Sequence, residues 1–144
     1  MAKMEDRELI DAAKEMLKYS YAPYSHFHVG AALLGKSGRL YTGCNVENAA
    51  YGPSNCAERT AFFKAVSEGE REFDSIAIVG GPDGVMGDYC APCGVCRQVM
   101  REFCDPGTFR IILASSEGGI RTFTLEELLP ESFGAANIRP SVDR

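Results

Sequence analysis

The sequence predicts an α/β fold built on a mixed sheet. Helical and strand-like segments alternate in the order helix, strand, strand, helix, strand, helix, strand, strand. The two strand–helix–strand units favour parallel strand pairs, whereas the link "SSEGGI" is too short for a crossover and predicts that the last two strands are antiparallel. With 144 residues, 45% of them hydrophobic, the chain can bury one core, and we expect a single domain over residues 1–144.

Three segments carry the apolar spacing of helices that bury one face. They are residues 5–18, 56–68 and 93–103. Asn55 is a good cap for the second helix, and Gly69 is a stop after it. In the third helix we expect four side chains to point inward: Val95, Val99, Met100 and Phe103.

Five short segments are predicted to be strands. They are residues 28–35, 39–46, 75–81, 109–116 and 120–124. The first two are joined by "KSG", which indicates a hairpin. From residue 125 onward the sequence predicts a short helix and a tail, whose apolar side chains pack either on the chain's own core or on a partner chain.

Composition and charge exclude several classes of protein. The net charge of −5 argues against a surface that binds a phosphate backbone, so we expect no nucleic-acid partner. No apolar run approaches the length that spans a membrane, and the amphipathic N-terminus lacks the apolar core of a signal peptide. We therefore expect a cytoplasmic protein, in which six cysteines are better explained by metal binding or catalysis than by disulfides.

Three cysteines stand at intervals of three in "YCAPCGVCRQV", residues 89–99. Cys93 and Cys96 fall on the first turn of a predicted helix, where positions three apart share a face, so both sulfurs can point at one metal ion. A thioredoxin-like redox pair also uses C-x-x-C at a helix start, but that motif follows the first strand of its fold and this one comes late in the chain. Cys90 precedes Pro92 and lies off the helix.

A second helix start, in "SNCAERTAFF", offers the rest of a metal site. Cys56 opens the helix, where the dipole stabilises a thiolate, and Glu58 follows in the first turn. Taken alone, these are an ordinary buried cysteine and an ordinary acid at a helix N-terminus. Together with P-C-x-x-C they indicate zinc bound by Cys56, Cys93 and Cys96, with a water as the fourth ligand. The competing interpretation is a closed Cys₄ structural site that includes Cys90, although such a site has no use for Glu58.

These motifs, with "SHFHVGAALL" and "TGCNVENAAYGPSNCAERTAFF", make the chain resemble the small cytidine deaminases of pyrimidine salvage over about residues 5–133. Zinc deaminases of this kind carry P-C-x-x-C and a glutamate that is not a ligand, and some use three cysteines. The resemblance implies a three-layer α/β/α sandwich around a five-stranded mixed sheet, one Zn²⁺ per chain, and a homotetramer with shared active sites. It also implies conversion of cytidine and 2′-deoxycytidine to uridine and 2′-deoxyuridine plus ammonia.

The resemblance also assigns roles to individual residues. Glu58 is expected to be the catalytic proton carrier. The expected substrate contacts are Phe27, Asn45, Glu47 and the backbone of Ala57, joined by Ala49, Tyr51 and Phe133 from neighbouring subunits. On the residues alone, Asn45 and Glu47 face the same side of a predicted strand, where they either hold hydroxyls or form a polar strand exit, and Phe27 is an ordinary core aromatic. The sequence departs from the family pattern after Phe133, where Gly134-Ala135 replaces a common Gly-Pro.

Three thiolates overcompensate a divalent ion and weaken its pull on a water proton. Two helix N-termini pointing at the ion can restore that pull, and Arg59 can donate to the ligand sulfurs; the alternative for Arg59 is a solvated surface charge. A related aminopyrimidine nucleoside, such as a blasticidin-type antibiotic, is the second candidate substrate. The acidic charge disfavours RNA-editing and nucleotide deaminases.

Overall fold

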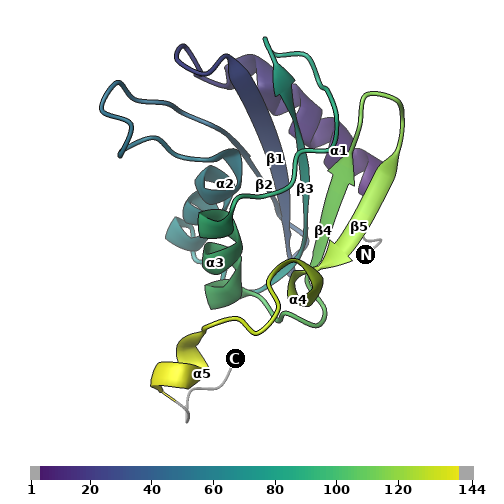
Figure 1. The fold of residues 1–144 in the computed structure, drawn as a ribbon. Coiled ribbons are helices and arrows are strands. Elements are labelled where there is room, and N and C mark those ends of the chain that lie inside the picture. The colour runs from purple at the N-terminus through teal and green to yellow at the C-terminus, as the bar shows by residue number, and fades with distance from the viewer. Residues whose placement is uncertain (1–3, 140–144) are drawn as a thin grey trace.

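The computed structural model describes residues 4–139 and contains a five-stranded sheet flanked by helices on both faces (Figure 1). The strands are β1 (Phe27–Gly35), β2 (Leu40–Cys44), β3 (Phe73–Pro82), β4 (Arg110–Ala114) and β5 (Ile120–Thr124). The helices are α1 (Asp6–Glu15), which continues as a 3₁₀ turn (Met16–Tyr19), α2 (Ala57–Ser67), α3 (Gly94–Phe103), α4 (Leu125–Leu128) and α5 (Ala135–Ile138). The two ends of the expected domain, residues 1–3 and 140–144, lie outside the described residues, as does the end of the expected tail.

The sheet is mixed, with the strand order β2-β1-β3-β4-β5. The last two strands, β4 and β5, are antiparallel, as the short link predicts, and β3 and β4 are parallel neighbours. β1 is antiparallel to both β2 and β3, so β2 and β3 run in the same direction without pairing with each other. The expected parallel pair is therefore found at β3–β4 but not at β2–β3. β1 takes an inner position, paired with β2 at one edge and with β3 at the other, and its residues 30–35 are buried.

The three-layer sandwich expected from the sequence is confirmed. On one face, Leu9, Ile10 and Ala13 of α1 pack against the sheet. On the other face, α2 and α3 cover a second core cluster that includes Phe62 and Met100, both fully buried. Figure 1 shows α2 and α3 side by side on one side of the sheet, and α1 on the other. Within residues 4–139, no helix combines the length and apolar character needed to cross a membrane.

Two glycines allow the helices to approach the sheet closely. A Cβ at Gly30 would lie 2.0 Å from the carbonyl oxygen of Ala13 in α1. A Cβ at Gly43 would lie 2.4 Å from the carbonyl oxygen of Ala57, at the start of α2. Both contacts are with backbone, so neither position has room for a side chain unless the helix moves. Gly43 thus sets the height of α2 above the sheet.

Three local predictions from the sequence are wrong. Asn55 does not cap α2: Cys56 is the N-cap residue, and the Asn55 amide instead donates to the Thr60 hydroxyl at 3.3 Å. Val95 does not point inward but is 57% exposed, because it lies on the side of α3 that faces away from the sheet. The regular part of the second strand ends at Cys44 rather than at residue 46, and residue 46 forms only isolated bridges.

Candidate active site

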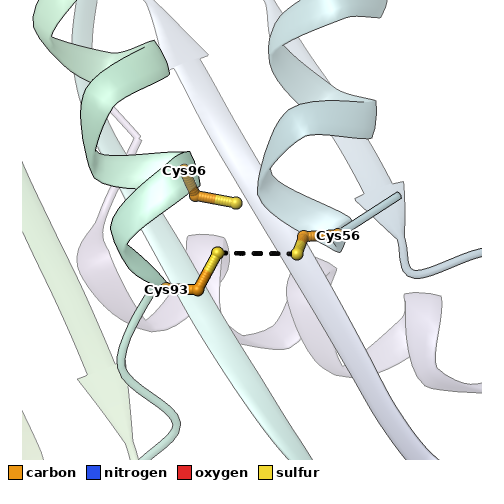
Figure 2. Close-up of side chains that lie close together, drawn as sticks. All are labelled: Cys56, Cys93 and Cys96. Carbon is orange, nitrogen blue, oxygen red and sulfur yellow. Dashed lines mark hydrogen bonds between the residues drawn. The ribbon is translucent and has the colours of Figure 1, made fainter. Parts of the chain in front are cut away.

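Three cysteine sulfurs converge where α2 and α3 begin (Figure 2). Cys56 is the N-cap residue of α2, Cys93 is the N-cap residue of α3, and Cys96 lies in the first turn of α3. The three Sγ atoms lie within 4.8 Å of one another, and those of Cys56 and Cys93 are 3.7 Å apart. The sequence prediction that both segments present cysteines at helix starts to one point is therefore borne out.

Strand direction explains why these two helix starts meet. α2 follows β2 and α3 follows β3, and these two strands run in the same direction. Their carboxyl ends therefore lie at the same edge of the sheet, which is where ligand sites form in α/β folds. Both helices point their positive N-terminal ends at the sulfurs, which favours thiolates over thiols.

The loop that delivers Cys93 is fixed to the sheet at several points. The amide of Gly87 donates to the carbonyl of Gly80 at 2.9 Å, and the amide of Ser116 donates to the carbonyl of Gly87 at 2.8 Å. Further along the loop, the Arg121 guanidinium lies 4.0 Å from the centre of the Tyr89 ring. These contacts hold the segment before α3 in one path and so help to fix the position of Cys93.

The sulfur spacing fits a zinc ion. Two thiolates on a tetrahedral zinc, with Zn–S bonds of about 2.3 Å, have sulfurs about 3.8 Å apart. The 3.7 Å between the Cys56 and Cys93 sulfurs matches this spacing, and it is also within hydrogen-bond range for two thiols. Three protein ligands leave one tetrahedral position for a water or substrate, which is the arrangement of catalytic rather than structural zinc sites.

Arg59 faces the cysteine cluster rather than the solvent. Its Nη2 atom donates to the Cys56 sulfur at 3.2 Å. Burial alone would lower the pKa of Arg59, but its contacts with the sulfurs of Cys56 and Cys96 raise that pKa. Hydrogen bonds from Cys96, then from Arg59 and Cys93, lower the pKa of Cys56 to about 5. The pKa of Cys96 is raised, because its hydrogen bond to Cys56 keeps a proton on Cys96.

Cys90 lies apart from this cluster. Among the described residues, the group that could hold a metal consists of Cys56, Cys93 and Cys96 and does not include Cys90. The Cys90 sulfur instead packs against the strand, 3.0 Å from where a Cβ on Gly80 would lie. Burial raises the pKa of Cys90 to about 12, so its thiol remains protonated. The closed Cys₄ site that the sequence left open therefore has no support in the geometry.

Glu58 is an acid buried beside the sulfurs. It lies in the first turn of α2 and is 4% exposed. Burial raises the pKa of Glu58 to about 7, and repulsion from the Cys56 thiolate adds to the increase. A carboxyl group that only capped the helix would face water. Its burial within the wall of a metal site is instead typical of a group that exchanges protons.

Asn45 and Glu47 follow β2 directly, and both are bonded to the segment that precedes β1. The Asn45 side-chain oxygen accepts from the Val29 amide at 2.9 Å and from the Ser20 hydroxyl, and its amide nitrogen donates to the Phe27 carbonyl at 2.8 Å. Glu47 accepts from backbone and side-chain donors of residues 24 and 25. β2 ends at Cys44 and reaches neither residue, so the prediction that both face one side of a strand is wrong, but their contacts place both beside Phe27.

Phe27 begins β1 and is 42% exposed, so it is not the ordinary core aromatic that the residues alone suggest. Because alternate residues of a strand share a face, Phe27 lies on the same side as Val29, which packs against the α2–α3 cluster. Ala57, the first residue of α2, is completely buried next to Cys56. The structure thus brings Phe27, Asn45, Glu47, Ala57 and the cysteines to one edge of the sheet.

Ala49, Tyr51 and Phe133 are exposed side chains on segments outside the sheet. Ala49 and Tyr51 are exposed in the loop before α2, where Tyr51 has a left-handed backbone with φ of 62° and its ring meets that of Tyr24 edge-on at 6.2 Å. Phe133 is 58% exposed in the segment that projects away from the sheet in Figure 1. The Gln98 amide donates to the Phe133 carbonyl at 2.9 Å, which ties this segment to α3. Phe133 and Ile138 do not pack on the chain's own core.

Known proteins resemble this chain in both sequence and structure. Residues 3–111 match the family described as "Cytidine and deoxycytidylate deaminase zinc-binding region". The chain belongs to this family. A cytidine deaminase of Sporosarcina psychrophila is 46% identical over 94% of this chain and 96% of its own, and one of Halalkalibacterium halodurans is 46% identical over 94% and 98%. The crystal structure of cytidine deaminase from Burkholderia pseudomallei superposes with a TM-score of 0.82 and 48% identity, covering 90% of this chain and 100% of that one.

Two serine hydroxyls that hold Asn45 and Glu47 in place were not predicted from the sequence. Ser20 donates to Asn45 and Ser25 donates to Glu47. Both serines lie more than twenty positions before their partners in the sequence, so local spacing carries no sign of the contact. The available signal was weak: Ser25 stands three residues before a predicted strand, in a turn segment where serine hydroxyls often bond to the backbone.

Proposed function

We propose that this chain catalyses the hydrolytic deamination of cytidine and 2′-deoxycytidine, releasing uridine or 2′-deoxyuridine and ammonia. The observation that carries the proposal is the buried carboxyl group of Glu58 beside three converging cysteine sulfurs. A closed structural zinc site needs four ligands and no acid, whereas a hydrolytic site needs an open ligand position and a proton carrier. The membership in the zinc deaminase family supports the same reaction.

The proposed roles in the zinc site follow from its geometry. Cys56, Cys93 and Cys96 hold one Zn²⁺ per chain, and Arg59 offsets the negative charge of the three thiolates. When bound, the ion supplies the Lewis acidity that makes water a nucleophile near neutral pH. Glu58 would take one proton from the attacking water and give it to the ring nitrogen. It would then take the second proton from the oxygen newly bonded to C4 and give it to the amine, which leaves C4 as ammonia. The pKa of about 7 allows Glu58 both to accept and to return a proton.

Hydrogen-bond capacity indicates how the sugar is held. A carboxylate has about four acceptor positions, and three of those on Glu47 are filled by the Tyr24 amide, the Ser25 amide and the Ser25 hydroxyl. The Asn45 oxygen has both its positions filled, while one of its two N–H groups is used. The pair thus retains one acceptor and one donor, which is the complement of a single hydroxyl group. A site that reads one sugar hydroxyl accepts both the ribose and the 2′-deoxyribose nucleoside.

We further propose a homotetramer in which neighbouring subunits complete each site. Phe27 is 42% exposed, and the side chains of Ala49, Tyr51 and Phe133 are exposed as well, so all four are available for contacts with neighbouring subunits. A cytoplasmic enzyme of pyrimidine salvage fits this assignment. The test of the assembly is a mixing experiment: chains carrying Glu58→Gln and chains carrying Phe133→Ala, each inactive alone, should regain activity when co-refolded. Failure to regain any activity, or a fully active monomer, contradicts shared sites.

The test of the activity is an ultraviolet assay on purified zinc-loaded protein with a panel of cytosine compounds. We expect turnover of cytidine and 2′-deoxycytidine, and none of cytidine monophosphate or of cytosine in RNA. Turnover of a blasticidin-type aminopyrimidine nucleoside, without turnover of cytidine, supports the second candidate substrate instead. Absence of turnover with every compound contradicts the enzymatic assignment.

A further inference from the structure

Ser25 occupies a turn that joins two parts of the proposed substrate site. Its hydroxyl accepts from the Phe27 amide at 3.0 Å and donates to the Glu47 carboxylate. A serine hydroxyl has a single proton, so once its oxygen accepts from the backbone of Phe27, its proton is directed at Glu47. The hydroxyl therefore connects the start of β1 to the carboxylate that follows β2.

The turn itself is fixed, so Ser25 cannot easily reorient. The next residue, His26, has a left-handed backbone with φ of 59°, an uncommon conformation for a residue other than glycine. Both backbone groups of His26 are bonded: its amide donates to the Ala22 carbonyl at 2.9 Å, and its carbonyl accepts from the Asp83 amide at 2.7 Å. Such a conformation persists only where the surrounding contacts determine it, so the structure holds Ser25 in one place.

We propose that Ser25 is a positioning residue that aims the Glu47 carboxylate at the sugar hydroxyl of the substrate, a role that rests on the function proposed above. The two amide donors from residues 24 and 25 both bind Oε1 of Glu47, and within residues 4–139 the Ser25 hydroxyl is the one donor that binds Oε2. Oε2 is also the atom with the remaining acceptor position. Ser25 thus fixes the direction of the lone pair that receives the sugar hydroxyl. The hydrogen bond from the Ser25 hydroxyl makes the largest contribution to lowering the pKa of Glu47. The carboxylate therefore stays ionised and can accept hydrogen bonds.

The chain offers a closely matched control. Ser37, in the turn between β1 and β2, also donates its hydroxyl to a carboxylate, that of Glu70, at 2.5 Å. It also accepts from the amide two residues ahead, that of Arg39, at 3.2 Å. Ser25 and Ser37 are both exposed, so replacing either with alanine removes the same hydrogen bonds without leaving a buried gap. Of these two serines, only Ser25 contacts the proposed substrate site.

The experiment compares wild type, Ser25→Ala, Ser25→Thr and Ser37→Ala on two substrates. Cytidine carries the 2′ and 3′ hydroxyls of the sugar, and 2′,3′-dideoxycytidine lacks both while keeping the 5′ hydroxyl. For Ser25→Ala we expect kcat/KM for cytidine to fall about tenfold, mainly through KM, as for a lost hydrogen bond to a charged group. For the dideoxy substrate, kcat/KM should change less than about twofold. Ser25→Thr, which keeps the hydroxyl, should restore cytidine turnover, and Ser37→Ala should change neither value.

The ratio of the two kcat/KM values is measured on one protein sample, so it does not depend on the fraction of a variant that is folded. A ratio in Ser25→Ala equal to that in wild type overturns the proposal, whether both substrates are unaffected or both are slowed alike. A fall in the ratio that Ser37→Ala reproduces overturns it as well. If wild type itself does not deaminate cytidine, the proposed function fails before the variants are compared, so the two failures are distinguishable.

Discussion

Replacing Gly43 with alanine should weaken zinc binding from a position that touches neither metal nor substrate. The new Cβ would lie 2.4 Å from the Ala57 carbonyl oxygen and 2.6 Å from the Ala61 amide nitrogen, both in the backbone of α2. An ordinary contact needs about 3.4 Å, so α2 must move about 1 Å from the sheet, and such overpacking costs about 1–3 kcal/mol. Because Cys56 adjoins Ala57 at the start of α2, the same shift moves one sulfur away from the other two.

Gly30→Ala is the control for this prediction. Its Cβ would lie 2.0 Å from the Ala13 carbonyl of α1, on the opposite face of the sheet. Both variants should lower the free energy of unfolding of the metal-free protein by similar amounts. Only Gly43→Ala should also lower zinc affinity, by about ten- to hundredfold, as for other residues that orient metal ligands. The measurements are thermal unfolding and competition with a colorimetric chelator. Equal zinc affinity in the two variants would refute the reasoning.

Three further outcomes are expected at the site itself. Glu58→Gln should keep one zinc per chain and the wild-type fold while kcat falls by about 10³-fold or more, since one group carries several proton transfers; near-normal turnover of a zinc-loaded sample would exclude the mechanism. Cys90→Ser should retain zinc and most activity, whereas Cys96→Ser should lose zinc, activity and stability, as measured by metal analysis and thermal unfolding; zinc loss in Cys90→Ser would indicate a Cys₄ site. Arg59→Ala should lower zinc affinity by about tenfold or more, because the thiolates lose their hydrogen-bond donor, and an unchanged affinity would mean that Arg59 does not offset the thiolate charge.

The sequence predicted the parts of this structure that depend on local patterns. Apolar periodicity located the three long helices and five strands to within a few residues, and the spacing of Cys93 and Cys96 placed their sulfurs correctly at a helix start. The convergence of Cys56 with these two cysteines was also predictable from the sequence. Helices that follow strands of the same direction begin at the same edge of a sheet.

Features that depend on tertiary contacts were not predictable in this way. The position of β1 between β2 and β3 depends on tertiary pairing, because the sequence of a buried strand does not specify its two neighbours. Asparagine is a common N-cap residue type, but the helix begins one residue later than the sequence suggested, so Cys56 rather than Asn55 is the N-cap residue. The hydrogen bond from Ser25 to Glu47 joins residues 22 positions apart, and no local pattern in either segment indicates that the two residues are in contact.

The central claim is that three cysteines and Glu58 form one zinc site that deaminates cytidine. The most direct measurement is a titration of metal-stripped protein with zinc, followed by cytidine turnover at each addition. We expect negligible activity without zinc and a linear rise that ends at one equivalent per chain. Full activity in the stripped protein, or none at any zinc concentration in a folded sample, would contradict the claim.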